Sequence, residues 1–548
     1  MSAFEMVHQD QVVGKLVGFD RLIFKGHLTR FYPEGGMKAF LDRQGVLLKD
    51  FGSWAKGLSD AVKAHAQAAA AAAGRPYLYL AETHTKSRGN GKEDLARQIM
   101  ARDHVVAGLI CVLAAVEPCS SFDIFRNKAT KHLEVVRRQR KCLHYYFYYL
   151  HPELGFCHVR LQGWLPFQVQ VWVNGREALS TSLAAKGVHH ARYLNAICSV
   201  ANWSLAQRLA DKWASRRWGR LLDGLARQVN PHLPMLRKAG YGPYWWVIDQ
   251  AEVATDVAFR SRHALEALLP TLFAHAASAF SAEDVLRFLG RKLTPQLACE
   301  VTSSARRRPE GWRVKHTMAR NSIKCYDKAN VLRVEVTIND PTQFRVLRNN
   351  NGHRIWCPMR KGVANLHRYF EVGRAANERY LEALAAATDN TDAMRVLDRH
   401  CRPIRNRGKS HPRLNPIGKD DLALFRAAHA GEHLINGFRN THLQARLYSR
   451  PPRDEAEAKR RCARTSRLIV KLRGHGLVAK VPRRRLSRVT PYGQRVLSAA
   501  AAVHDTAFPA AYTMPAATAH DTERRRDSSA RTLSRTAQVL RRRSTDLT

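Results

Sequence analysis

Three closely spaced runs of strand-like sequence constrain the fold of this chain more than any other feature. They are Cys142–Leu150 (CLHYYFYYL), Gly155–Leu161 (GFCHVRL) and Phe167–Val173 (FQVQVWV). Each run is rich in aromatic and β-branched residues, and turn-forming sequences, HPELG and NG, follow the first and the third. Such short connections join antiparallel neighbours. The first third of the chain is therefore predicted to contain an antiparallel sheet.

Helical periodicity alternates with strands in the rest of the chain, so the expected fold class is α+β, an antiparallel-sheet core with helical insertions. Helices are expected at Phe51–Ala73, Glu93–Arg102, Glu177–Gln228, Ser261–Ala277 and Arg360–Ala387. Further strands are expected at Gly14–Leu28, Tyr244–Phe259 and Arg313–Ile338. No internal repeat is evident in the sequence.

Shifts in composition divide the chain into six segments. They are an N-terminal α+β domain (1–176), a helical segment (177–243), an α+β core (244–402), a linker (403–418), a C-terminal winged-helix domain (419–503) and a basic tail (504–548). The linker, PIRNRGKSHPRLNPIG, holds five Pro or Gly residues. The tail is low-complexity Ala, Thr, Ser and Arg sequence, and we expect it to be disordered.

The charge of the chain indicates a polyanionic partner. It carries 90 Lys plus Arg against 46 Asp plus Glu, a formal net charge of +44. Self-repulsion of this size disfavours the compact state unless a polyanion relieves it, and nucleic acid does so by releasing its condensed counterions. We therefore expect DNA, double-stranded or single-stranded, as the partner, with RNA as the alternative.

The cysteines and the apolar segments indicate a cytoplasmic protein. The ten cysteines form no CxxC pair, which argues against a zinc ribbon or a disulfide framework and favours a reducing compartment. The N-terminus has no signal-peptide pattern, and no apolar run is long enough to cross a bilayer. We expect no membrane partner.

The C-terminal domain carries the densest positive charge. Residues 456–488 contain twelve Lys or Arg and one acid, Glu457. The run RTSRLIVKLRGHGLVAKVPRRRLSRVTPYGQRVL resembles a winged helix–turn–helix, in which a recognition helix is followed by a turn and a basic wing. The resemblance implies that the helix enters the major groove and the wing contacts the backbone. The expected DNA-binding residues are Arg460, Arg461, Arg464, Arg467, Lys471, Arg483, Arg484, Arg485 and Arg488.

A second informative segment is NSIKCYDKANVLRVEVTIND, at 321–340. A two-residue turn at 329–330 would place Tyr326 opposite Arg333 and Lys324 opposite Glu335. Period-two alternation then gathers Lys324, Tyr326, Lys328, Arg333 and Glu335 on one face, with aliphatic residues on the other. The hairpin is thus predicted to have a core face and a face that bears a phenol, three bases and a carboxylate.

Carboxylates of two strands suggest a metal site beside this phenol. Alternation puts Glu252 and Asp256 on one face of the strand Tyr244–Phe259, and with Glu335 they could hold Mg²⁺ or Mn²⁺. A metal that polarises a phosphate beside a nucleophilic tyrosine would support DNA nicking. The free phenol has a pKa of about 10, and we expect the neighbouring bases to favour the phenolate of Tyr326.

This pattern is similar to the plasmid and phage rolling-circle replication initiators of the Rep-trans type. That family has an acidic strand, then Ser-x-x-x-Tyr-Asp/Asn-Lys, then Arg-x-Glu. The matching residues are Glu252, Asp256, Ser322, Tyr326, Asp327, Lys328, Arg333 and Glu335. The resemblance covers residues 244–345 and implies that Tyr326 attacks DNA and keeps a 5′-phosphotyrosine link. The His-hydrophobic-His metal motif of the wider nicking superfamily is not evident.

The leading hypothesis is a DNA-binding protein of a bacterial mobile element or plasmid, a replication initiator or nicking endonuclease with Tyr326, Lys328 and Arg333 as its catalytic residues. A non-enzymatic, sequence-specific regulator that uses only the winged helix is one alternative. An RNA-binding protein that stacks bases on Tyr145 and Phe147 is another. The Tyr326 hairpin also has a purely structural interpretation, because cross-strand Tyr–Arg and Lys–Glu pairs are common on solvated sheets.

Overall fold

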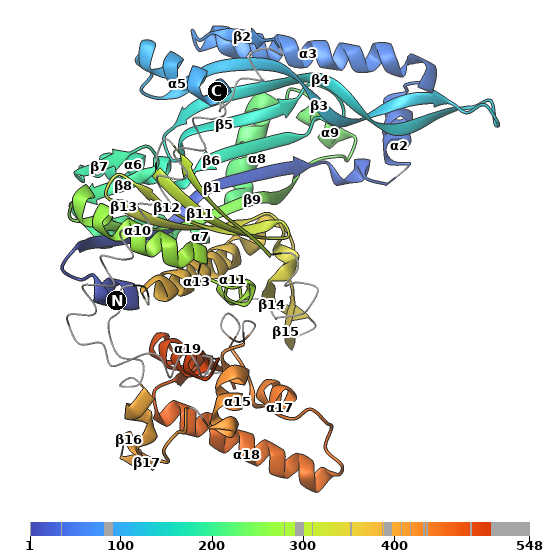
Figure 1. Ribbon diagram of the computed structural model, residues 1–548. Coiled ribbons are helices and arrows are strands. Elements are labelled where there is room, and N and C mark those ends of the chain that lie inside the picture. The colour runs from blue at the N-terminus through green and yellow to red at the C-terminus, as the bar shows by residue number, and fades with distance from the viewer. Residues whose placement is uncertain are drawn as a thin grey trace, which may run out of the picture. The chain divides into compact units, whose positions relative to one another are not determined.

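A computed structural model gives the structure of the protein (Figure 1). It describes residues 2–505 except 34, 82–90, 279, 291–300, 309–310, 351–352, 386, 388–396, 407, 417, 431–432, 434–436 and 483–484. Almost all of the tail expected at 504–548 lies outside the described residues. The chain forms two compact units. The first comprises Met1–Asn390, Ala430–Phe438 and Val481–Pro491, and the second comprises Thr391–His429, Arg439–Lys480 and Tyr492–Thr548.

The first unit is built on a sheet of eleven strands in the order β10-β11-β12-β13-β9-β1-β6-β5-β4-β3-β2. Their bounds are β1 (Val12–His27), β2 (Tyr77–Leu80), β3 (Gly108–Arg126), β4 (Leu133–His151), β5 (Gly155–Gln162), β6 (Val169–Asn174), β9 (Trp245–Phe259), β10 (Val301–Arg308), β11 (Gly311–Met318), β12 (Asn321–Lys328) and β13 (Val331–Ile338). Neighbouring strands are antiparallel except β2 and β3, which are parallel. The expected α+β class is confirmed. The sheet takes its strands from the predicted segments 1–176 and 244–402, and the predicted helical segment between them adds no strand to it.

The strand order contains a repeat of connectivity. Helices follow β1, and the meander β3-β4-β5-β6 then returns to pair with β1. Helices α10 (Arg262–Ser278) and α11 (Ala282–Phe288) follow β9, and the meander β10-β11-β12-β13 returns to pair with β9. The strands β1 and β9 pair with each other, antiparallel, at the centre of the sheet. The sheet therefore consists of two halves with the same strand connectivity, except that the first half has an additional strand, β2, which pairs with β3.

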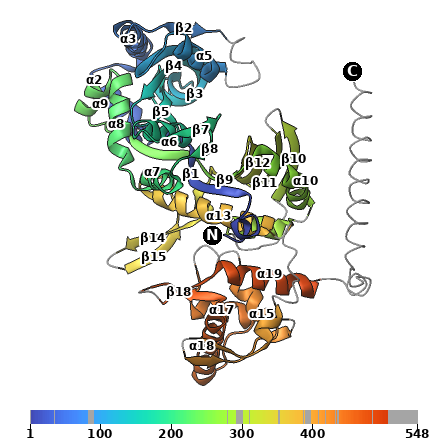
Figure 2. The ribbon, with the colours of Figure 1, turned by 90° about the vertical axis from the view of Figure 1, so that its left-hand side faces the viewer.

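One face of the sheet carries the main hydrophobic core. Helices α3 (Phe51–Ala72) and α8 (Trp218–Val229) cover the β1–β6 half, and α10 and α13 (Leu366–Ala385) cover the other half (Figures 1 and 2). Helix α13 approaches β9 closely at Gly373, where an added Cβ would lie 2.6 Å from the side chain of Val253. The remaining elements near this layer are α1 (Ala3–Val7), α2 (Gly36–Gln44), α9 (Leu233–Lys238), β14 (Arg345–Asn350) and β15 (His353–Pro358).

The opposite face is covered only in part. Helix α5 (Gly91–Arg102) packs on β3, and α6 (Gly175–Ala184) and α7 (Trp203–Ser215) pack on β1. Charged side chains of the central strands, among them Arg21 and Lys25 of β1, stay partly exposed on this face. This is the face that carries the candidate site.

The stretch Glu177–Gln228, expected to be helical, contains a β-hairpin. Strands β7 (His190–Tyr193) and β8 (Ala196–Val200) pair between α6 and α7. Leu194, at the turn, has a positive φ of 53°. A right-handed helix has a negative φ at every residue, so the helix cannot continue through this position. The Ala, Leu and Arg content of the surrounding helices concealed this short hairpin in the sequence. Its tip carries Asn195, which reaches the candidate site.

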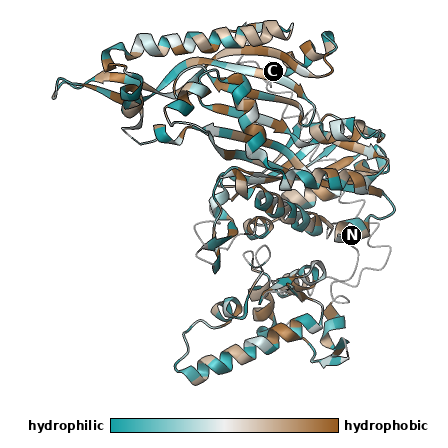
Figure 3. Ribbon diagram, turned by 180° about the vertical axis from the view of Figure 1, so that it is seen from behind, coloured by the Kyte–Doolittle hydropathy of each residue, from teal (hydrophilic) through white to brown (hydrophobic). Residues whose placement is uncertain are grey.

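The C-terminal region has the element order that the sequence predicted for residues 420–498, two helices, a longer helix, two strands and a last helix. The elements are α15 (Lys419–Ala428), α17 (Asn440–Leu447), α18 (Glu455–Gly474), β18 (Val478–Lys480), β19 (Ser487–Val489) and α19 (Pro491–Asp505). The predicted linker is folded, because β16 (Ile404–Asn406) and β17 (Lys409–His411) pair within it and contact α18. Figure 3 shows α18 as hydrophilic along its first part and hydrophobic towards its end. Within the described residues, no helix has the length and apolar character needed to cross a membrane.

Candidate active site

The hairpin of β12 and β13 forms as alternation predicted. Tyr326 lies opposite Arg333, and Lys324 lies opposite Glu335. Strand β9 pairs with β13 and places Asp256 opposite Arg333. The residues that the sequence singled out in two separate segments therefore share one face of neighbouring strands.

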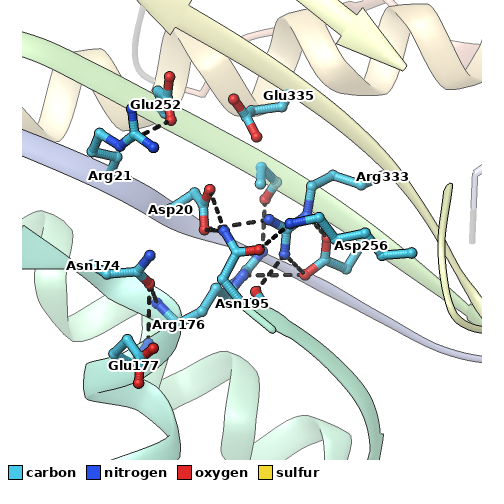
Figure 4. A network of polar contacts seen from close by, with 12 residues as sticks. Asp20, Arg21, Asn174, Arg176, Glu177, Asn195, Glu252, Asp256, Arg333 and Glu335 are labelled. Atoms are coloured by element: carbon cyan, nitrogen blue, oxygen red, sulfur yellow. Dashed lines mark hydrogen bonds and ion pairs between the residues drawn. The ribbon is translucent and has the colours of Figure 1, made fainter. Parts of the chain in front are cut away.

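Three buried carboxylates meet on this face (Figure 4). Asp20 of β1, Glu252 of β9 and Glu335 of β13 each offer an oxygen within 4.8 Å of the other two. Their residues are only 3%, 5% and 1% exposed. The pairing of β1 with β9 is irregular between Phe19 and Leu22, and Asp20 lies in this bulge. Three carboxylates at this spacing form a suitable site for a hard divalent cation such as Mg²⁺ or Mn²⁺. We call these three residues the carboxylate cluster.

Asp256, expected among the metal ligands, is not brought to this cluster. It accepts hydrogen bonds of 2.5 and 2.9 Å from Arg333, and its Oδ2 lies 3.1 Å from Nε of Arg176. All three side chains are buried. Because both carboxylate oxygens of Asp256 are occupied by guanidinium groups, Asp20 takes the place that the sequence interpretation gave to Asp256. Arg333 joins the two groups, since its Nη1 lies 3.3 Å from Asp20.

Sequence reasoning missed Asp20 because its strand lies far from the other two in the chain. One signal was present, since Asp20 is the sole acid within Gly14–Leu28. It would have become informative only with the knowledge that β1 lies beside β9.

The phenol of Tyr326 donates a hydrogen bond of 2.5 Å to Oε2 of Glu335. Burial, and then the charge of Glu335, raise the pKa of Tyr326 well above its ordinary value. This corrects the expectation that nearby bases favour the phenolate. The amine of Lys324 lies 2.5 Å from Glu335 and 3.5 Å from Glu252, so its charge acts mainly on carboxylates.

The two glutamates of the carboxylate cluster differ in acidity. Burial alone would raise the pKa of Glu335, but the charges of Lys324 and Arg333 outweigh it and lower that pKa to about 2. Burial, and then the charge of Glu335, raise the pKa of Glu252. Glu335 is therefore an anion at neutral pH, and Glu252 binds a proton more readily than an ordinary glutamate. A divalent cation would compete with that proton for the site.

Lys328 lies next to Tyr326, with its Nζ 5.5 Å from the ring centre. Burial, and then the charge of Arg333, lower the pKa of Lys328. Its amine donates to Oδ1 of Asn195, whose own amide donates to Asp20 at 2.7 and 2.8 Å. The carbonyl of Asn195 accepts a hydrogen bond of 2.7 Å from Arg333. Asn195 thus connects the phenol side of the site to the carboxylate cluster.

Positive side chains continue across the same face on both sides of the carboxylate cluster. Strands β10 and β11 add cations beside Tyr326, and β1 adds two on the other side. We call this set the basic lane, Arg306, Arg313, Lys315, Arg21 and Lys25. A phosphate backbone lying along this lane would pass over the carboxylate cluster.

The arginines and lysines expected to bind DNA through the C-terminal region fall into three groups. The exposed ones are Arg460, Arg464, Arg467, Arg485 and Arg488. Lys471 lies 2.9 Å from Asp421, and Arg461 lies 2.6 Å from Glu457, so these two cations have partners within the protein. Arg483 and Arg484 lie outside the described residues.

The tyrosine-rich strand offers no exposed stacking platform. Tyr145 and Phe147 are fully buried in the main core, and Tyr149 packs against it. Tyr146 and Tyr148, on the other face, are buried beside α5. The aromatic residues of β4 therefore give no support to the RNA-binding alternative.

Comparisons of the chain with protein-family models, with curated proteins and with solved structures found no match.

Proposed function

We propose that the protein is a metal-dependent DNA-nicking enzyme with Tyr326 as its nucleophile. The observation that carries this proposal is the hydrogen bond of 2.5 Å between the Tyr326 hydroxyl and Glu335, a member of the carboxylate cluster. A phosphate bound over the cluster would lie within reach of this phenol. The net charge of +44 and the basic lane favour a polyanion on this face.

The reaction would be a transesterification. The Tyr326 oxygen forms a bond to phosphorus as the bond from phosphorus to the 3′-oxygen breaks, which leaves a 5′-phosphotyrosine and a 3′-hydroxyl. The phenolic proton is released to solvent as the bond to phosphorus forms, because Glu335, with a pKa of about 2, accepts the hydrogen bond of the phenol but is too weak a base to keep its proton. Lys328, with its lowered pKa, is placed to supply a proton to the departing 3′-oxygen. A divalent cation held by the carboxylate cluster would neutralise the phosphate oxygens.

A nicking assay tests the proposal. We would incubate the protein with Mg²⁺ or Mn²⁺ and a supercoiled plasmid that carries the DNA flanking its own gene. We expect open-circle product and a covalent protein–DNA adduct, both lost in Tyr326→Phe and with EDTA. Tyr145→Phe is the matched control, because this buried phenol lies on the opposite face and has no hydrogen-bond partner among the described residues.

The affinity for Mn²⁺ shows whether the carboxylates of the cluster are metal ligands or have only a structural role. Asp20→Asn and Glu252→Gln should abolish nicking and weaken Mn²⁺ binding at least about tenfold, measured by calorimetry without DNA. Asp249→Asn, which changes a partly exposed carboxylate of β9 paired with Lys25, should leave Mn²⁺ binding unchanged. Equal Mn²⁺ affinity in all these proteins would contradict the metal site.

A second function is favoured by the exposed arginines of α18. Together with the resemblance to a winged helix, they support sequence-specific binding of duplex DNA. Absence of nicking with intact, salt-sensitive binding of the same plasmid DNA would favour a regulator over an enzyme.

A further inference from the structure

A pocket of about 280 Å³ opens between the end of β1 and the outer parts of β3 and β4. Lys25, the last cation of the basic lane, lines it together with Arg137 and Arg160. Of the described residues that line it, none is acidic. The volume is near the lower end of the range for small-molecule sites, about 300 Å³. Lys25 lies 2.9 Å from Asp249 and Arg160 lies 2.8 Å from Glu117, but neither carboxylate lines the pocket, so cationic groups face it and suit a ligand with phosphate groups.

Aromatic rings form one side of the pocket. Phe31, Tyr32 and Phe122 line it, and the guanidinium of Arg137 lies 5.4 Å from the ring centre of Tyr32 and 5.6 Å from that of Phe122. Tyr32 is 53% exposed, so its ring is accessible at the rim. Phe31 and Phe122 are buried, so Tyr32 is the ring that a ligand can reach. An exposed ring beside a cation is an element on which proteins stack unpaired bases.

Neutral hydrogen-bonding groups form the other side. Gln139, Gln162 and Gln168 line the pocket together with His144. Burial, and then the charge of Arg160, lower the pKa of His144 to about 4, so its imidazole is neutral at pH 7. Amides and a neutral imidazole can both donate and accept hydrogen bonds. They match the edge of a nucleobase, and that edge is free only when the base is unpaired.

The basic lane leads from the carboxylate cluster to the pocket. Lys25 and Arg21 project from the same face of β1, and four residues of strand span about 13 Å. The guanidinium of Arg21 lies 3.7 Å from Glu252. A single strand that follows the lane would therefore reach the pocket within a few nucleotides of a phosphate at the carboxylate cluster.

We propose that this pocket binds one unpaired nucleotide of single-stranded DNA, with its base against Tyr32 and its flanking phosphates on Lys25 and Arg160. The proposal rests on the proposed function in one respect, namely that the bound strand is the strand cut at Tyr326. The pocket would then fix the position of that strand relative to the nucleophile. It would also require the duplex to be open at this point.

Photocrosslinking tests the pocket without any cleavage. The full-length Tyr326→Phe protein in EDTA would be mixed with a single-stranded 20-mer that contains 5-iodouracil, irradiated and analysed by mass spectrometry. We expect cross-links to Tyr32. In fluorescence anisotropy, the double variant Tyr32→Ala, Gln139→Ala should bind the same oligonucleotide about tenfold more weakly. Tyr79→Ala, at a tyrosine that is 59% exposed on β2, is the matched control.

Three outcomes would overturn the proposal. They are cross-links confined to other parts of the protein, an unchanged affinity in the double variant, and an equal yield of pocket cross-links from the duplex form of the oligonucleotide. Binding of free dTMP with no oligonucleotide cross-link would identify a mononucleotide site instead, which also overturns it. Cross-links in the pocket together with a failed nicking assay would remove only the enzymatic function, so the two failures are distinguishable.

Discussion

Asp256 is a buried charge whose partners are also charged and buried. Arg333 and Arg176 both bind its carboxylate, and none of the three side chains is more than 1% exposed. Asp256→Asn would leave two guanidinium groups with reduced compensation, and we expect the free energy of unfolding to fall by about 3–5 kcal/mol. Urea titration followed by circular dichroism measures this loss.

Asp249→Asn provides the comparison, because Asp249 is 32% exposed and its ion pair with Lys25 is partly solvated. Its loss should cost less than about 1 kcal/mol. Equal destabilisation by the two substitutions would show that the buried network contributes no more than a surface ion pair.

Residues of the site could be predicted from the sequence only where local alternation fixed them. Tyr326, Arg333 and Glu335 lie in one hairpin, so period two and a two-residue turn determine their neighbours. Asp20 could not be found in this way, because its position depends on the pairing of distant strands and on a bulge. Asp256 lies on the predicted face, but which partner it binds depends on Arg176 of α6, the last residue of the predicted N-terminal α+β domain and distant from Asp256 in the chain.

Among the elements, the two hairpins on either side of β12 share one turn conformation. Ala319 and Ala329 have φ values of 49° and 48°. This left-handed region costs a residue with a Cβ roughly 1 kcal/mol and costs glycine little. Glycine relieves this strain, but it also increases the conformational entropy of the unfolded chain, which offsets part of the gain. We therefore expect Ala329→Gly and Ala319→Gly each to raise the free energy of unfolding by about 0.5 kcal/mol.

Thermal unfolding of the single and double variants measures these effects, which should add because the turns lie at opposite ends of β12. Ala329→Val should have the opposite sign, since a β-branched residue tolerates this φ least. A loss of stability in both glycine variants would contradict the explanation.

Short strands were the elements that the sequence concealed. The β7–β8 hairpin lies within a helix-rich stretch, and β16 and β17 lie in a segment whose Pro and Gly content indicated a linker. A strand of three to five residues has too few alternating positions for a period of two to stand out from the pattern of the flanking sequence. Among the long elements, α3 and β9 match their predicted ranges to within one residue at each end. Strand β4 begins at Leu133, well before the predicted Cys142, because its first half is rich in charged residues.

For the whole molecule, the excess of positive charge predicts strong dependence of DNA binding on salt. The logarithm of the affinity should fall linearly with the logarithm of salt concentration, by roughly 0.9 for each phosphate neutralised. Arg464→Ala and Arg467→Ala, on the exposed face of α18, should each reduce this slope for duplex DNA by about one. Fluorescence anisotropy at four or more salt concentrations measures it.

Lys63→Ala is the control for this measurement, because Lys63 is exposed on α3, which covers the core face of the sheet. The slope of this variant should equal that of the unaltered protein. Slopes that fall equally in all three variants would indicate a nonspecific charge effect and contradict a role for α18.

The antiparallel pairing of β1 with β9 makes the two halves of the first unit dependent on each other. If the chain were severed between them, each half would expose a central strand as an open sheet edge. Asp20 belongs to one half, and Glu252 and Glu335 belong to the other. Neither half contains all three carboxylates of the cluster. If the cluster binds a metal as proposed, that binding depends on the pairing of β1 with β9, and loss of this pairing would abolish it before the rest of either half unfolds.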